Sequence, residues 1–256
     1  WDRRAVCDAP VVVVGQGGVG KTWASLAWIM ANLEALPIVI TIPAGSVTAA
    51  TSATAEGLLR LIGERLATVT GARDTEHWSS RIKRILARPE DEGPSLCILF
   101  DGINQNDRVP WLPIMALLQD RPFAGVARSI VTTRPQHFER QLSRMRSLVE
   151  VPEVTTVERF DVSPGGELDE MLAAHRLSRE DLHPDLIEYA RIPRLFDLVV
   201  RLRDRLTDAG RVTTHRLLWE YGRDAQGVRS GSSFSEAEWQ EWLGTIARNE
   251  RDGLRN

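Results

Sequence analysis

The 256-residue sequence predicts an α/β fold with a parallel sheet, followed by a smaller all-helical region. Short apolar runs rich in β-branched residues alternate with segments whose apolar residues recur at helical spacing. Beyond the helix-breaking sequence Ser163-Pro164-Gly165-Gly166, only helical spacing remains. The chain is 43% hydrophobic and 26% charged, which is ordinary for a protein that buries a substantial core.

The first element is a strand. Val11 to Val14 form a continuous β-branched run that glycines terminate, a pattern typical of a strand buried on both faces. A helix is predicted from Lys21 onward, because apolar residues at i, i+3, i+4 and i+7 share one of its faces. These residues are Trp23, Leu26, Ala27 and Met30.

The following elements continue the alternation. Further strands are predicted at 38–42, 96–100 and 129–133, and a last one near 157–162. Helical spacing separates them around Leu58 to Leu66, Trp78 to Leu86 and Ile114 to Leu118. We therefore expect one domain over 1–163, a small helical domain over 164–232 and the start of a third unit over 233–256, where Ser235 to Glu238 has a capping-box pattern.

The loop after the first strand carries the clearest motif. Gly15-Gln16-Gly17-Gly18-Val19-Gly20-Lys21-Thr22 follows the pattern G-x-x-x-x-G-K-[ST], in which glycines let backbone N–H groups approach phosphates. Lys21 is expected to reach the β- and γ-phosphates, and the Thr22 hydroxyl to ligate Mg²⁺. The motif predicts a P-loop nucleotide-binding domain that takes ATP or GTP with Mg²⁺.

Two further strand ends are expected beside this loop. Asp101 ends the apolar run that begins at Leu96, which makes it the Walker B candidate for binding the metal. Without a P-loop upstream, the Asp101-Gly102 step would more often indicate a tight turn after a strand. Arg134 follows the hydroxyl pair Thr132-Thr133 at the same edge of the sheet and is a candidate sensor of the γ-phosphate. An arginine paired with a surface carboxylate is the alternative interpretation.

Composition argues against several classes of function. A net charge of −3 and a pI near 6.0 give no overall attraction to nucleic acid or to an acidic membrane surface. No apolar run is long enough to span a bilayer, and no signal peptide is visible, so a cytoplasmic protein is expected. The five histidines show no metal-ligand spacing.

These motifs resemble the STAND class of signalling NTPases, and within it the NACHT-like modules of bacterial defence proteins and animal innate immune receptors. The resemblance spans roughly residues 10 to 248 and includes the P-loop, the segment 100–105 and the segment 131–135. A fourth segment, 190–195, resembles the Gly-x-Pro stretch that implies a base contact for Pro193. The sequence departs from the family at Asn104 and Gln105, where an acidic pair is usual, and at Arg191, where glycine is frequent.

The resemblance implies an ATP/ADP-dependent switch with adenine as the base, a truncated winged-helix domain after 233, self-association on activation, and sensor and effector domains elsewhere in a longer chain. Slow hydrolysis would involve Lys21, Asp101, Gln105 and Arg134, with Gln105 orienting water. The expected nucleotide contacts are Gly15, Gln16, Gly17, Gly18, Val19, Gly20, Lys21, Thr22, Trp23 and Pro193. Two alternatives stay open: an AAA+-like motor ATPase acting on nucleic acid or protein, with Arg194 as second sensor, and a non-hydrolysing nucleotide-binding module.

Overall fold

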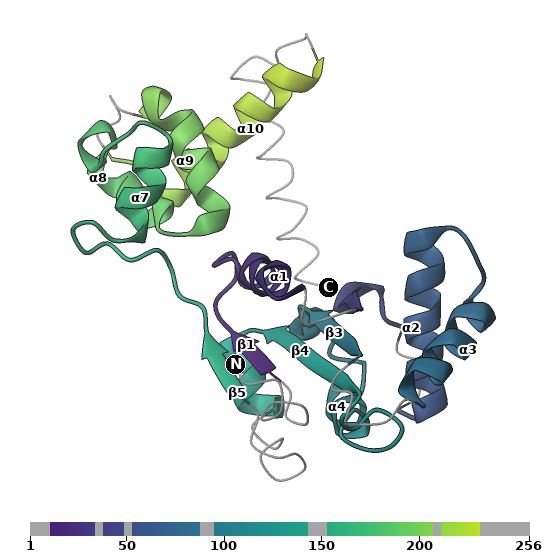
Figure 1. The fold of residues 1–256 in the computed structure, drawn as a ribbon. Coiled ribbons are helices and arrows are strands. Elements are labelled where there is room, and N and C mark those ends of the chain that lie inside the picture. The colour runs from purple at the N-terminus through teal and green to yellow at the C-terminus, as the bar shows by residue number, and fades with distance from the viewer. Residues whose placement is uncertain are drawn as a thin grey trace, which may run out of the picture. The chain divides into compact units, whose positions relative to one another are not determined.

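The computed structural model describes residues 11–33, 38–48, 53–87, 95–142, 153–206 and 211–230 (Figure 1). The chain divides into two compact units between Arg159 and Phe160. We call them the sheet unit and the helical unit. The division falls slightly before the boundary expected at residue 163, and the third unit expected over 233–256 lies outside the described residues.

The sheet unit is built on five parallel strands in the order β2-β3-β4-β1-β5, which confirms the predicted α/β class. Because β4 lies between β1 and β3, the ends of three strands meet beside the glycine-rich loop. The strands are β1 (Val11–Val14), β2 (Val39–Pro43), β3 (Leu96–Asp101), β4 (Ala127–Thr133) and β5 (Glu153–Thr156).

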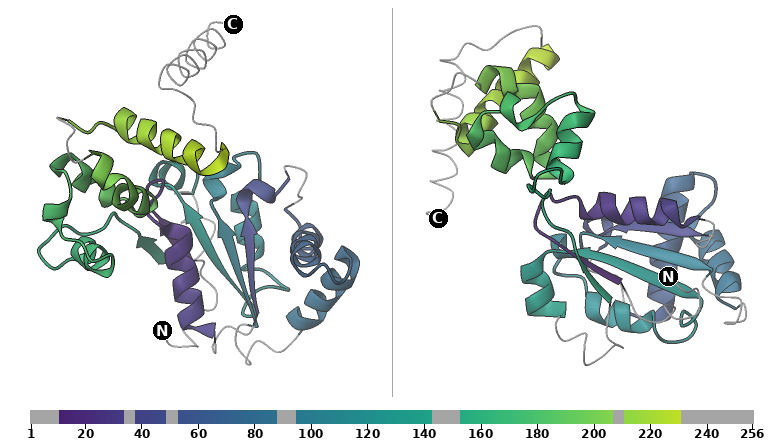
Figure 2. Two further views of the ribbon diagram at one scale, coloured as in Figure 1. Left: turned by 90° about the horizontal axis from the view of Figure 1, so that it is seen from above. Right: turned by 60° about the vertical axis from the view of Figure 1, so that its left-hand side comes forward.

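Helices cover both faces of the sheet. Ile29 of α1 packs against alternate residues of β1, β3 and β4 on one face, while Trp111 and Ile114 of α4 join the core on the other (Figure 2). The helices are α1 (Lys21–Ala31), α2 (Ala55–Thr70), α3 (Thr75–Leu86), α4 (Trp111–Leu117) and α5 (Pro135–His137). Shorter turns are η2 (Ala44–Ser46), η4 (Ile103–Gln105) and the π-helical η5 (Phe138–Leu142).

The apolar residues predicted to share one face of α1 do so, but this face is the outer one. Trp23 is 77% exposed and Met30 66% exposed, whereas Ser25 and Ile29 are buried. Lys21, Ser25 and Ile29 stand at i, i+4 and i+8, so they lie on one side of the helix. The lysine must turn back over the loop at the end of β1, and this requirement directs Ser25 and Ile29 toward the sheet.

The last strand was predicted at the wrong residues. β5 covers Glu153–Thr156 and pairs with β1 in register from Val11↔Glu153 to Val14↔Thr156. The N–H of Val157 still donates to the carbonyl of Val14 at 2.7 Å, after which the chain leaves the sheet. Phe160 and Val162, which made the later segment look like a strand, instead pack on the core of the helical unit.

Helices form the described secondary structure of the helical unit, as the apolar spacing beyond residue 163 predicts. Leu168, Leu172, Val199, Leu202 and Leu206 are all fully buried in its core. Its helices are α7 (Glu167–Ala174), η6 (Arg179–Asp181), α8 (Pro184–Ala190), α9 (Pro193–Leu206) and α10 (Thr214–Ser230). None of the helices within the described part of the chain has the length and apolar character needed to cross a bilayer.

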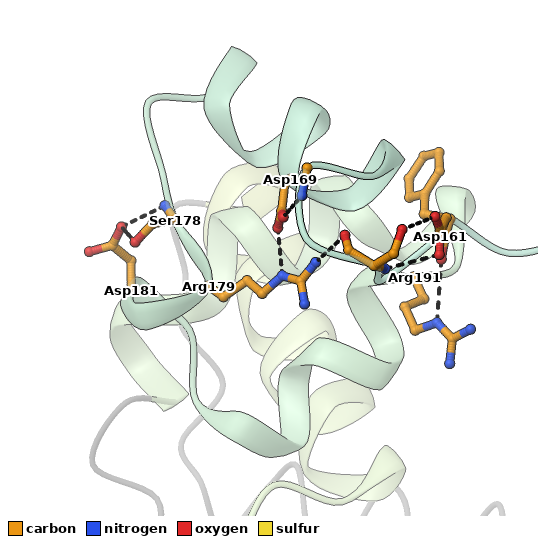
Figure 3. Close-up of polar contacts among 9 residues, drawn as sticks. Asp161, Asp169, Ser178, Arg179, Asp181 and Arg191 are labelled. Atoms are coloured by element: carbon orange, nitrogen blue, oxygen red, sulfur yellow. Dashed lines mark hydrogen bonds and ion pairs between the residues drawn. The ribbon is translucent and has the colours of Figure 1, made fainter.

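Polar contacts bind the first residues of the helical unit to its helices (Figure 3). The N–H of Phe160 donates to the carbonyl of Arg191 at 2.8 Å. Asp161 accepts from the Ser163 N–H at 2.9 Å and from the Ser163 hydroxyl. The guanidinium of Arg179 binds both the carboxylate of Asp169 and the carbonyl of Ser163. The segment from Phe160 onward is therefore a fixed part of this unit.

Candidate functional site

The loop between β1 and α1 has the backbone shape that its glycines allow. Gly18 and Gly20 have φ values of 85° and 93°, in the left-handed region that favours glycine. Among the described residues, no backbone or side-chain acceptor pairs with the N–H groups of Gly17, Gly18, Val19 or Gly20. Unpaired N–H groups at the start of a helix form a site suited to a phosphate.

Lys21 lies over this loop. Its Nζ donates to the carbonyls of Gly15 and Gln16, each at 2.8 Å. Burial lowers the pKa of Lys21, the positive charge of Arg134 lowers it further, and Asp101 acts in the opposite direction. Two cations are thus held close together, and a bound polyanion would relieve their repulsion.

The Walker B candidate meets the P-loop threonine. Thr22 Oγ1 donates to Asp101 Oδ1 at 2.8 Å, although 79 positions separate the two residues in sequence. This contact confirms that the end of β3 lies beside the loop. A carboxylate next to a hydroxyl, at a site open to phosphate oxygens, matches the ligands that Mg²⁺ takes from proteins and nucleotides.

The two threonines at the end of β4 have different surroundings. The sequence places both hydroxyls at this end of the strand but does not say which one reaches the site. Thr132 donates to Asp101 Oδ1 at 2.7 Å and accepts from the Gly102 N–H at 2.7 Å. Thr133 is fully buried, and its Oγ1 has no hydrogen-bond partner among the described residues. Only Thr132 therefore belongs to the site.

Arg134 follows β4 and reaches the loop. A Cβ atom placed on Gly17 would lie 3.6 Å from one guanidinium nitrogen of Arg134. The side chain is exposed, so it is available to a ligand on the loop. No carboxylate of the described residues pairs with it, which disfavours the alternative of a surface ion pair, and its role as a sensor stays a prediction.

Gln105 lies over the turn that follows Asp101. Gly102 has a φ of 72°, and a Cβ atom there would come within 2.6 Å of the Gln105 Nε2. The Gln105 Oε1 would lie 3.7 Å from a Cβ on Gly45, in the turn after β2. The amide therefore sits between the ends of β2 and β3, next to the metal candidate.

Asn106 is a residue of this region that the sequence does not single out. Its Nδ2 donates to the carbonyl of Val47 at 2.6 Å and more weakly to that of Ala44 at 3.4 Å. Its own carbonyl accepts from the indole Nε1 of Trp111 at 2.8 Å. Asn106 thus fastens the turn after β2 to the turn that carries Gln105. No sequence pattern indicates a side-chain to backbone bond of this kind.

Three of the predicted nucleotide contacts differ in their surroundings from the glycines of the loop. The Val19 side chain is buried and packs against Gly15, so it shapes the loop. Trp23 is exposed in the first turn of α1, next to Thr22. Pro193 is the first residue of α9 in the helical unit. Contact of these three residues, and of the other loop residues, with a nucleotide stays a prediction.

Thr22 and Asp101 suit a metal ion that is bound together with a nucleotide and shares its phosphate oxygens. No group of three or more His, Cys, Asp or Glu side chains suited to a metal exists within the described ranges. Thr22 and Asp101 supply only two oxygen-bearing side chains. Mg²⁺ is commonly bound in this way, by one or two protein ligands together with substrate phosphates and water.

Comparison with known proteins shows similarity only at the level of structure. No protein-family model matches the sequence, and no curated protein is significantly similar to it. The chain is similar to the structure of Drosophila ORC bound to DNA, with a TM-score of 0.50 and 14% identity over 88% of this chain and 64% of that one. It is also similar to the Aeropyrum pernix ORC1 protein in complex with DNA, with a TM-score of 0.48 and 15% identity over 84% of this chain and 59% of that one.

This chain thus spans less than two thirds of the length of either solved structure. At 14% identity the similarity concerns the fold. Together with the parallel sheet and the glycine-rich loop between β1 and α1, it identifies the chain as having a P-loop NTPase fold.

Proposed function

We propose that the chain is an ATP/ADP-dependent switch of the STAND type, with slow Mg²⁺-dependent hydrolysis of ATP. The observation that carries the proposal is the 2.8 Å contact between Thr22 Oγ1 and Asp101 Oδ1, directly beside the P-loop lysine. This contact brings together a hydroxyl and a carboxylate that would share one metal ion with a nucleotide. The NACHT-like subclass rests on the segments 100–105 and 131–135.

Binding would use groups already in place. The unpaired N–H groups of the loop and the Lys21 ammonium would hold the phosphates, and Thr22 and Asp101 would hold the metal. Mg²⁺, when bound, supplies positive charge that neutralises phosphate oxygens. Arg134 would add a guanidinium on the γ-phosphate side of the loop.

Hydrolysis would be slow because Asn104 and Gln105 stand where the resembled family has an acidic pair, and neither side chain can act as a carboxylate base. Gln105 occupies the position next to Gly102, and an amide orients water without accepting its proton. The charged groups can still stabilise the developing charge on the transferred phosphoryl group. A long-lived bound state suits a switch better than a motor.

A short tether supports coupling between the loop and the helical unit. Val157 is bound to β1 through its N–H, and its carbonyl lies against Gly15. Phe160 is bound to Arg191, two residues before Pro193. Only Glu158 and Arg159 lie between these two anchors. In our proposal a change at the loop alters the path of this tether, and the resulting rearrangement permits self-association.

The first experiment identifies the nucleotide that the purified protein releases on denaturation, with Lys21→Ala as the control. ADP from the wild type and none from the variant is the expected result. Retained ATP would instead favour a non-hydrolysing module. An empty site combined with steady turnover of added ATP would favour a motor-type ATPase and contradict the switch.

A second candidate function is an ATPase that acts on nucleic acid, although the overall charge argues against such a partner. The similar Drosophila ORC structure is described as bound to DNA. In this chain, Arg81 and Arg84 are exposed on α3, and Arg73 is exposed just before the helix. Duplex binding measured by fluorescence anisotropy tests the candidate. Loss of binding in Arg81→Glu/Arg84→Glu and acceleration of ATP turnover by DNA would support it.

A further inference from the structure

Thr132 lies at the centre of the hydrogen bonds around the metal candidate. It is 1% exposed, and its Oγ1 is 2.7 Å from both Asp101 Oδ1 and the Gly102 nitrogen. A hydroxyl has one proton and two lone pairs. Since the Gly102 N–H can only donate, Thr132 accepts from it and gives its own proton to Asp101. The direction of both bonds is therefore fixed.

Asp101 Oδ1 accepts a second proton, from Thr22 at 2.8 Å. No residue in the described part of the chain hydrogen-bonds the other carboxylate oxygen, Oδ2. Two hydroxyls on one oxygen fix the rotation of the carboxylate and leave Oδ2 free. Because the Thr22 proton points at Asp101, the lone pairs of the Thr22 oxygen remain available to a cation.

The two hydroxyls differ in what happens to them when a metal binds. Thr22 is itself a proposed ligand, so its oxygen would turn toward the metal and its bond to Asp101 would adjust. Thr132 is buried on β4 and held by the Gly102 N–H, so its bond to Asp101 can persist. Partners that orient a metal ligand in this way commonly change metal affinity 10- to 100-fold, roughly, when they are removed.

We infer that Thr132 is a positioning residue, which orients the Asp101 carboxylate for the metal and fixes the turn at Gly102 that leads to Gln105. The inference rests on the proposed nucleotide function and deepens it. It gives β4 a role in metal binding in addition to the phosphate contact proposed for Arg134.

The chain provides a matched control in the neighbouring residue. Thr133 is also a threonine at the end of β4 and is fully buried, but its hydroxyl has no partner among the described residues. Thr132→Val and Thr133→Val remove the same group from adjacent positions and keep nearly the same shape. Thr132→Ser keeps the hydroxyl and removes only a methyl group.

The test measures binding of Mn²⁺ to the protein saturated with ADP, by electron paramagnetic resonance of the free ion. We expect Thr132→Val to weaken Mn²⁺ binding by about tenfold. Thr132→Ser and Thr133→Val should stay within about twofold of the wild type. ADP binding in the presence of EDTA should be unchanged in all three variants, because the phosphate contacts are intact.

Equal Mn²⁺ affinity in Thr132→Val and the wild type would overturn the inference. Equal weakening of ADP binding with and without EDTA would also overturn it, since that result indicates a general packing role. Should Thr132→Val fail to fold, Thr132→Ala removes the same hydroxyl without the branched side chain. In an Asp101→Asn background, the Thr132→Val change should have no further effect on Mn²⁺. A wild type that binds no ADP, like Lys21→Ala, would refute the proposed function itself and the inference with it.

Discussion

The carbonyl oxygen of Val157 lies so close to Gly15 that a Cβ atom on the glycine would come within 2.5 Å of it. The contact joins the first residue of the P-loop to the last residue anchored in the sheet. We expect Gly15→Ala to lower the free energy of unfolding by about 1–3 kcal/mol, because the backbone of one strand must shift. Urea denaturation measures the effect.

Gly17→Ala is the control for this change. The atoms nearest to a Cβ on Gly17 belong to the flexible Arg134 side chain, the first at 3.6 Å, which is ordinary contact. Its unfolding midpoint should therefore match that of the wild type. Gly15→Ala should also weaken nucleotide binding, since the loop and the end of β5 move together. Identical midpoints for the two variants would refute the close contact.

Arg134 should discriminate ATP from ADP. Its guanidinium lies beside Gly17, at the loop that would hold the phosphates. We expect Arg134→Ala to bind ADP nearly as the wild type does but to lose turnover by about 100-fold, the cost typical of removing one charge-stabilising donor. Arg134→Lys keeps the charge but loses the planar fork, so its turnover should be intermediate. Single-turnover ATP hydrolysis and ADP titrations of each variant test this expectation. Unchanged turnover in Arg134→Ala would contradict it.

Nucleotide binding should take up protons at alkaline pH. The pKa of Lys21 is lowered by burial and by Arg134, and a bound polyphosphate would raise it again. Affinity is then highest where free Lys21 is charged, and it falls as pH rises through the lowered pKa. Phosphate groups, whose second pKa is about 6, are fully ionised there and add no protons.

Titration calorimetry in two buffers of different ionisation enthalpy measures this uptake. Lys21→Arg is the control, because a guanidinium stays charged throughout. We expect the wild type to take up protons on binding nucleotide and the Lys21→Arg variant to take up none. Equal heats in both buffers for the wild type would show that Lys21 keeps its proton in the free protein.

The strand ends could be predicted from sequence because each carries a recognisable pattern. The run from Leu96 ends in Asp101, and the run from Ser129 ends before Arg134-Pro135. In a parallel sheet such ends lie at one edge, so the sequence alone predicts that Lys21, Asp101 and Arg134 lie close together. The order β3-β4-β1 then brought them to the same loop.

Other features depend on contacts that no local pattern encodes. The outward face of α1 follows from the position of Lys21 over the loop, while apolar spacing alone marks a face without saying what it meets. The place of β5 follows from its register with β1. Asn106 acts through backbone carbonyls of a turn about 60 residues earlier, and Thr132 through a bond across two strands. The sequence around Asn106 or Thr132 does not indicate which distant group either side chain binds.

The turn at Gly102 allows the role of Gln105 to be isolated from backbone strain. Gly102 and Gly71 both have positive φ, at 72° and 61°, so alanine at either position should cost roughly 1–2 kcal/mol of stability. A Cβ on Gly71 meets nothing within 4 Å, whereas one on Gly102 would strike the Gln105 amide at 2.6 Å. Gly102→Ala should therefore displace Gln105 and slow hydrolysis, while Gly71→Ala should only lower stability. Turnover at saturating ATP and Mg²⁺, measured well below either melting temperature, separates the two effects. If both variants hydrolyse ATP at the same rate, Gln105 does not orient the water, and the slow turnover expected for this site must have another origin.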